Sequence, residues 1–102
     1  MLDRYDGFDW DEGNIEKCQR HGVSCNEIEV AFGLGVMVVP DLAHSLVEQR
    51  LIAVNRNFEG RPLFVAFTLR EIDDFILVRP VSARYMHQKE IEKYEKVSRT
   101  QN

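Results

Sequence analysis

The stretch CQRHGVSC, residues 18–25, decides how the first part of the chain folds. Two cysteines flank a histidine here, as they could in half of a metal site or in a Cys/His catalytic pair. A zinc site would also need a fourth ligand, with His44 the nearest candidate, and ligands on two helices would have to converge. The same letters describe a helical corner, in which Gly22 ends one helix and Ser24 caps the next. We favour the corner, because every residue in the stretch except Cys25 has a structural role there.

Helices are expected on both sides of this corner. Asp11 or Asn14 can cap the first helix, which should run to about His21. Ser24 and Glu27 have the spacing of a capping box at the start of the second helix. Its inward face is expected to consist of Ile28, Ala31 and Phe32. The sequence therefore predicts an N-terminal helical hairpin.

The remainder of the chain has the pattern of short strands followed by one helix. Residues 8–10 and 36–39 are short extended segments, and longer strands rich in β-branched and aromatic residues are expected at 49–55, 61–70 and 75–83. Turns are expected at 57–60 and 71–74, a polar loop at 41–48, and a closing helix at about 85–97 with a thin apolar stripe. Pro80 fits an edge or a strand end better than a sheet centre. The predicted fold class is α+β, with the helical hairpin packed on a small antiparallel β-meander and a C-terminal helix.

Length and composition indicate a single globular domain, residues 1–102. Its core is expected at about 8–97, with a short flexible tail at 98–102. A chain of 102 residues can bury roughly two-thirds of its unfolded surface, which is enough for a core without disulfide bonds. No apolar run approaches the roughly 20 residues that a membrane helix needs. The acidic start has no apolar signal region, so we expect a cytoplasmic protein with free thiols.

The charge is unevenly distributed along the chain. Up to Glu48 there are ten acidic and three basic residues, and from Gln49 onward there are seven acidic and ten basic residues. A sequence pI of about 5.3 argues against a simple polyanion-binding protein. The basic second half can nevertheless carry a local patch that binds phosphate, although a solvated surface of mixed charge would give the same counts.

Arginines on the predicted strands are the main candidates for chemistry, because P-loop, GxGxxG, HExxH and CxxC motifs are absent. The four candidates are Arg50, Arg70, Arg79 and Arg84. If the first two long strands pair antiparallel, Arg50 and Arg70 come close at one end. Arg79 lies in the apolar stretch LVRPVSA, where an unpaired guanidinium is costly. It should therefore pair with a carboxylate inside the fold or face a cleft that binds an anion. His44 and Glu48 are possible acid–base groups.

Several motifs occur in an order that is typical of one family. They are FDWDEGN (8–14) with Lys17; RHGVS (20–24); Asp41 with His44-Ser45; Glu48-Gln49-Arg50; Gly60-Arg61 with Leu63-Phe64; Phe67-Thr68 with Arg70; and Arg79 with Val81-Ser82-Ala83-Arg84, Met86, Glu90 and Tyr94. On these motifs the chain resembles the BrnT toxins of type II toxin–antitoxin systems. The resemblance covers nearly the whole domain.

The resemblance implies a compact fold similar to that of the RelE-type ribonucleases, and RNA cleavage that arrests growth. It also implies a BrnA-like antitoxin with a ribbon-helix-helix DNA-binding part. Operator DNA would then be reached only through the antitoxin, and no membrane is involved.

Cleavage of RNA can proceed without a metal or another cofactor, because the 2′-hydroxyl supplies the nucleophile. The reaction needs a base, an acid and positive charge on the phosphorane. Charge stabilisation is assigned to Arg50, Arg70, Arg79 and Arg84, with Arg79 and Arg84 preferred. The acid–base candidates are His44, His21, Glu48 and Tyr94. The alternative is a non-catalytic module that binds an antitoxin or DNA-binding partner without cutting RNA.

Overall fold

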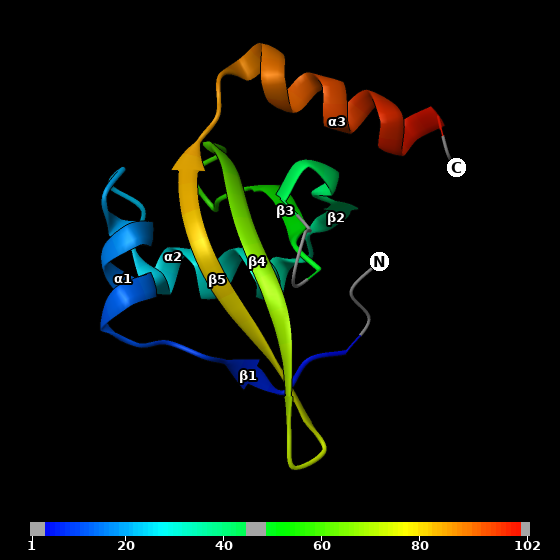
Figure 1. Ribbon diagram of the computed structural model, residues 1–102. Coiled ribbons are helices and arrows are strands. Elements are labelled where there is room, and N and C mark those ends of the chain that lie inside the picture. The colour runs from blue at the N-terminus through cyan, green and yellow to red at the C-terminus, as the bar shows by residue number, and fades with distance from the viewer. Residues whose placement is uncertain (1–3, 45–48, 101–102) are drawn as a thin grey trace.

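A computed structural model describes residues 4–44 and 49–100 of the chain, with side chains as far as residue 97. Three helices and five strands lie within these ranges (Figure 1). The strands are β1 (Gly7–Phe8), β2 (Met37–Pro40), β3 (Leu51–Arg56), β4 (Pro62–Ile72) and β5 (Phe75–Tyr85). The helices are α1 (Glu12–Gln19), α2 (Cys25–Leu34) and α3 (Gln88–Thr100), and a 3₁₀ turn spans Leu42–His44. The predicted mixed α+β class is therefore confirmed.

The five strands form one open sheet in the order β1-β5-β4-β3-β2. Strands β2 to β5 each pair antiparallel with the next strand along the chain, which is a meander. β1 adds to the sheet in parallel, with Phe8 opposite Val78 of β5. This pairing, which the sequence did not indicate, brings the acidic residues after Phe8 beside the middle of the last strand.

Local capping explains where α1 and α2 begin. Asp11 caps α1: its Oδ1 accepts a hydrogen bond from Asn14 N–H at 3.0 Å, and Asn14 Oδ1 accepts one from Asp11 N–H at 2.7 Å. Gly22 has a φ of 85° in the turn between the helices, a conformation that glycine adopts without strain. The Ser24 hydroxyl accepts from Glu27 N–H at 3.1 Å and so caps α2. The sequence prediction for both helix starts is confirmed.

The main core lies between these two helices and one face of the sheet. Its fully buried members are Cys18, Val23, Ile28, Ala31, Phe32, Ala53, Leu63, Val65, Phe67, Val78 and Ala83. Two members of this set, Cys18 and Val23, come from the stretch CQRHGVSC, and neither has exposed surface. Burial, with a smaller contribution from nearby Cys25, raises the pKa of the Cys18 thiol to about 11. The two thiols are free, and Cys18 is a packing residue.

Pro80 lies within β5, opposite Phe67 of β4. The β4–β5 register shifts at this point, so that Val81 has no partner on β4 and forms a bulge. On its other side β5 pairs with β1 only as far as Val78, so Pro80 is on a local edge of the sheet. A bulge and a free edge are the two settings in which a strand tolerates a residue without an N–H donor. The expected edge position is met, although Pro80 is not at the end of the strand.

The turn between β4 and β5 is shorter than the sequence predicted. β4 continues to Ile72 and β5 begins at Phe75, which leaves a two-residue loop. Asp73 and Asp74 have φ values of 49° and 71°, in the left-handed region that a tight hairpin of this type requires. Aspartate tolerates that region better than bulkier residues do.

The C-terminal helix begins later than the sequence predicted. Tyr85, expected near the start of this helix, is the last residue of β5, and α3 begins at Gln88. Ile91 of α3 is buried with Met86 and Val54 in a second, smaller cluster on the sheet. Among the described residues, no helix is both long enough and apolar enough to cross a membrane.

Candidate functional site

The residues that the sequence singled out are spread over several parts of the molecule. Arg70 and Arg79 lie near β1, Arg84 lies near the start of α3, Tyr94 lies within α3, and His21 is in the turn between α1 and α2. His44 ends the 3₁₀ turn, Arg50 directly precedes β3, and Glu48 lies outside the described residues. The described candidates therefore do not converge on one cleft.

A compact group of charges lies where β1, α1 and β5 meet. It contains Asp9, Asp11, Lys17, Arg70 and Arg79, and we call it the Asp9 cluster. Arg79 Nη2 donates to Asp11 Oδ2 at 2.7 Å, and Arg79 Nη1 lies 3.4 Å from Asp9 Oδ2. Arg70 Nε lies 3.6 Å from the same Asp9 oxygen. Of the two settings that the sequence allowed for Arg79, the structure shows carboxylate pairing.

The sheet register brings the two arginines of the cluster together. Arg79 pairs with Thr68, and Arg70 pairs with Leu77, two positions away on each strand. Such diagonal neighbours lie on one face, within reach of long side chains. Arg50 stands one residue beyond the Leu51–Phe67 pair, at the same end of the sheet. The predicted position of Arg50 and Arg70 at a common end agrees with this register.

Mutual hydrogen bonding holds the Arg79–Asp11 pair in its charged form. The Asn14 N–H and then the Arg79 guanidinium lower the pKa of Asp11 below its ordinary value. The hydrogen bond to Asp11 is the main reason that the pKa of Arg79 is raised. The Arg79 side chain is 21% exposed, so one part of this cation still faces solvent.

A small hollow of about 200 Å³ lies beside Arg79. It is lined by Gly13, Asn14, Lys17, Arg79, Pro80 and Val81. Lys17 and Arg79 contribute two positive charges, and the first turn of α1 contributes the positive end of a helix dipole. This hollow suits a small anion such as a phosphate group.

Two further arginines join α3 to the sheet, through a pair of contacts that we call the α3 clamp. Arg56 donates to both carboxylate oxygens of Glu95, at 2.9 and 3.1 Å. Arg84 donates to both oxygens of Glu90, at 3.0 and 2.8 Å, and stacks over the Phe64 ring at 4.2 Å. Its hydrogen bond to Glu90 raises the pKa of Arg84 and lowers that of Glu90. This arrangement gives Arg84 a structural role that the sequence did not reveal.

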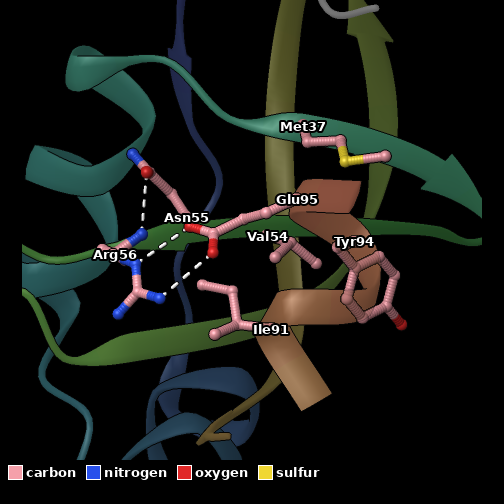
Figure 2. A pocket seen from close by; sticks show the side chains of 7 residues that line it. All are labelled: Met37, Val54, Asn55, Arg56, Ile91, Tyr94 and Glu95. Atoms are coloured by element: carbon pink, nitrogen blue, oxygen red, sulfur yellow. Dashed lines mark hydrogen bonds and ion pairs between the residues drawn. The ribbon is translucent and has the colours of Figure 1, made fainter. Parts of the chain in front are cut away.

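A larger hollow of about 350 Å³ lies beside the α3 clamp, between α3, β2 and β3 (Figure 2). Met37, Val54, Ile91 and Tyr94 form its apolar walls, and Asn55, Arg56 and Glu95 form its polar end. These polar groups already bond to protein partners, since Asn55 Nδ2 donates to Gly35 O at 2.6 Å and Arg56 binds Glu95. The hollow therefore suits an apolar side chain better than a charged group.

The end of β5 carries a polar cluster that the sequence did not single out as a site. Tyr85 OH donates to Glu27 Oε1 at 2.7 Å, and Arg61 Cζ lies 3.4 Å from the centre of the Tyr85 ring. Asn57 Nδ2 donates to the other Glu27 oxygen at 3.1 Å. Burial and then the bond to Glu27 raise the pKa of Tyr85. The Glu27 carboxylate, expected to complete a capping box, thus ties α2 to the sheet instead.

Neither described histidine of the sequence prediction lies in the Asp9 cluster. His21 is exposed in the turn, and His44 Nδ1 lies 3.0 Å from Asp41 Oδ2 in an exposed local pair. Within residues 4–44 and 49–97, no three His, Cys, Asp or Glu side chains gather as metal ligands would.

Asp9 and Asp11 are the members of the site that sequence reasoning missed as functional candidates. Two signals pointed to them: the acidic bias of the first half of the chain, and their place in the FDWDEGN motif. Their partners on β4 and β5 lie more than 60 residues away and could not be identified without the parallel strand β1.

Comparison with known protein families supports the resemblance. Residues 10–90 match the model of one family, described as the ribonuclease toxin BrnT of type II toxin–antitoxin systems. No curated protein matches the chain significantly. The matched range includes Asp11, Lys17, Arg70 and Arg79, and Asp9 directly precedes it.

Proposed function

The chain belongs to the BrnT family of ribonuclease toxins of type II toxin–antitoxin systems, and on this premise we propose that it cleaves RNA by a metal-independent attack of the ribose 2′-hydroxyl. Membership implies an RNA substrate and an antitoxin partner. In the proposed reaction the 2′-oxygen attacks the adjacent phosphorus and the 5′-oxygen leaves. The products are a 2′,3′-cyclic phosphate and a 5′-hydroxyl.

The observation that carries this proposal is the hollow lined by Lys17 and Arg79, together with Arg70, which shares the Asp9 contact of Arg79. Negative charge builds up on the phosphorane, so cations fixed at the phosphate lower the barrier. The planar guanidinium of arginine matches two phosphate oxygens at once. We therefore assign charge stabilisation to Arg79 and Arg70. Arg50 is kept as a third candidate, whereas the Glu90 pair of Arg84 favours a structural role.

The acid that protonates the leaving oxygen is proposed to be one of the sequence candidates. His44 is exposed and, within residues 4–44 and 49–97, its ring pairs with Asp41, so it could move toward a bound RNA strand. Tyr94 lines the larger hollow, and His21 is exposed in the helical corner. Glu48 stays a sequence prediction.

The antitoxin is proposed to be a BrnA-like protein with a ribbon-helix-helix part, through which the complex would bind operator DNA. We place its binding surface on α3 and the larger hollow. Among the described side chains of this helix, Ile91 and Tyr94 pack against the smaller core cluster, and the hollow beside them has room for a side chain from a partner. The family resemblance further suggests a RelE-like arrangement of a single domain, in the cytoplasm.

The direct test uses purified protein free of antitoxin, incubated with single-stranded RNA in EDTA. We expect cleavage with cyclic phosphate ends, and no cleavage at a position where a single 2′-deoxy nucleotide replaces the ribose. Cleavage that requires added Mg²⁺, or that continues at the 2′-deoxy position, would contradict the mechanism.

A second candidate function is a non-catalytic BrnT-like module that binds a partner without cutting RNA. The observation in its favour is that Arg70, Arg79 and Arg84 are each paired with a carboxylate of the same chain. Such a protein would bind an antitoxin and leave RNA intact in the same assay.

A further inference from the structure

Asp9 is held rigidly between the sheet and α1. Its N–H donates to Val78 O at 2.9 Å, and its carbonyl accepts from Asn14 Nδ2 at 2.9 Å. Asn14 is itself buried, and the same amide group donates to Pro80 O at 2.8 Å. One neighbouring strand, β5, and one helix, α1, therefore fix the backbone of this aspartate, and a fixed backbone helps to position a group for chemistry.

The Asp9 carboxylate uses one of its two oxygens. Both Arg70 and Arg79 approach Oδ2, at 3.6 and 3.4 Å, and these distances are longer than those of a tight charge-assisted bond. Among the described residues no hydrogen bond to Asp9 Oδ1 is found, and the side chain is 26% exposed. One oxygen can therefore accept a proton from a bound molecule.

Asp11 differs from Asp9 because both of its carboxylate oxygens accept hydrogen bonds. Its Oδ1 accepts from Asn14 N–H as the cap of α1, and its Oδ2 accepts from Arg79 at 2.7 Å. Both oxygens are thus engaged in structural bonds. Asp11 therefore caps α1 and neutralises Arg79. Asp9 instead keeps one carboxylate oxygen without a hydrogen bond among the described residues, beside the two arginines proposed to bind phosphate.

We infer that Asp9 is the general base of the RNA cleavage reaction, an assignment that rests on the proposed function. A phosphate that occupies the hollow contacts Arg79, and Arg79 and Arg70 also contact Asp9, so the adjacent 2′-hydroxyl is brought to the carboxylate. Aspartate is ionised at neutral pH and can take the 2′-hydroxyl proton as the 2′-oxygen bonds to phosphorus.

The bonds and protons of this step can be accounted for in full. As the new 2′-O–P bond forms, the P–O5′ bond breaks and the leaving oxygen takes a proton from the general acid or from water. Asp9 then releases its proton to solvent. The charged groups that face Asp9 in this step are Arg70 from β4 and Arg79 from β5. Asp11, the cap of α1, pairs with the same Arg79, and Lys17 of α1 lines the hollow that Arg79 also lines.

The test compares Asp9→Asn with the matched variant Asp11→Asn. Each removes one carboxylate from Arg79, and asparagine is as good a helix cap as aspartate, so α1 keeps its start in the control. Single-turnover cleavage of an RNA oligonucleotide is measured in EDTA, with binding of an uncleavable 2′-deoxy analogue and a thermal melt for each variant.

We expect Asp9→Asn to lose roughly 100-fold or more in cleavage rate, the usual contribution of a general base, while it binds the analogue at least as tightly as the unaltered chain. Asp11→Asn should lose far less. Asp9→Glu, which keeps the carboxylate but displaces it, should fall between the two. If Asp9→Asn does not fold, a cleavage rate for Asp9→Glu equal to that of the unaltered chain would itself contradict the assignment.

Two results would overturn this inference. Asp9→Asn with equal or faster cleavage would show that Asp9 only masks the arginines, and equal losses in both Asn variants would show that the ion pairs, not the base, matter. An unaltered chain that cleaves no RNA would refute the proposed function and this assignment with it. An active chain with an active Asp9→Asn variant refutes the assignment alone.

Discussion

The Asp9 cluster and the α3 clamp both pair arginines with carboxylates, but in different geometries. In the α3 clamp, Arg56 and Arg84 each bind both oxygens of one carboxylate at 2.8–3.1 Å. In the Asp9 cluster, Arg70 and Arg79 share one oxygen of Asp9 at 3.4–3.6 Å, and Arg79 also donates to Asp11 at 2.7 Å. Arg79 and Lys17 line a hollow. A bidentate pair satisfies both partners and joins two elements. A longer contact to one shared carboxylate oxygen leaves the arginines able to bind a third group, such as a phosphate.

This difference shows that arginine on a strand is not by itself a sign of a phosphate site. The carboxylate geometry around each guanidinium separates a structural arginine from one that can also contact an RNA phosphate. Arg79 can make such a contact more easily than Arg84, because it lines a hollow and its contact to Asp9 is long, whereas both oxygens of Glu90 hold Arg84.

The largest expected effect is a difference in RNA cleavage between an arginine variant of the Asp9 cluster and one of the α3 clamp. Arg79→Ala should lower the RNA cleavage rate by roughly 100- to 1,000-fold, because it removes one charge contact to the transition state. Arg84→Ala should lower it much less, because that arginine is held by Glu90. Cleavage rates and thermal melts of both variants check this. Equal losses with intact folds would mean that both regions contact RNA.

A smaller effect is expected at Lys17, on the rim of the hollow. Lys17→Ala should weaken RNA binding several-fold and reduce the salt dependence of binding, with a slope smaller by about 0.7 if one phosphate contact is lost. Binding of an uncleavable oligonucleotide at several salt concentrations measures this slope. Lys93→Ala on α3 is the matched control, and its slope should stay close to that of the unaltered chain.

The α3 clamp should show its role in local stability. Arg84→Ala is expected to speed hydrogen exchange in α3 by about two- to five-fold, the size of effect that partly exposed ion pairs give. Exchange in β4 should change little, because α1 and α2 cover its other face. If hydrogen exchange in α3 is unaltered while RNA cleavage is lost, Arg84 belongs to the reactive site, and the α3 clamp is not the structural counterpart of the Asp9 cluster.

The smallest effect is a pH dependence of the α3 clamp. The bond to Arg84 lowers the pKa of Glu90 below its ordinary 4.5 in the folded protein. The unfolded chain therefore binds a proton first as the pH falls, and the contribution of this pair to stability is lost below about 4.5. Thermal melts between pH 6 and pH 3 should show a fall of the melting temperature that is smaller, by a few degrees at most, in Glu90→Gln. Identical pH profiles would show that the pair does not stabilise the fold.

Much of the fold could be predicted because its signals are local. Asp11 and Ser24 cap helices through bonds to residues three positions away, and Gly22 turns the chain between them. Alternating β-branched and aromatic residues likewise indicated the long strands. Element ends were less accurate: Tyr85 was expected near the start of the last helix, but antiparallel pairing with Leu63 keeps it in β5.

The site was predicted less completely. Arg70 and Arg79 were named from the sequence, but Arg84 was grouped with them because all three lie on strands. The register and the α3 clamp separate them, since Glu90 reaches Arg84 from the first turn of α3. For Asp9 the sequence offered only the acidic bias and the FDWDEGN motif, because its partners Arg70 and Arg79 lie more than 60 residues away.

By itself, the sequence determined the helix caps, the tight turns, the alternation of the strands, the family and the opposite charge of the two halves. The tertiary structure alone decided which acid meets which base. Capping and turn formation depend on residues a few positions apart, whereas an ion pair between Asp9 and Arg79 depends on β1 adding in parallel to β5. That addition places Asp9 directly after β1 and next to Arg79. An acidic residue of the first half of the chain and a basic residue of the second half thereby come together in the proposed site.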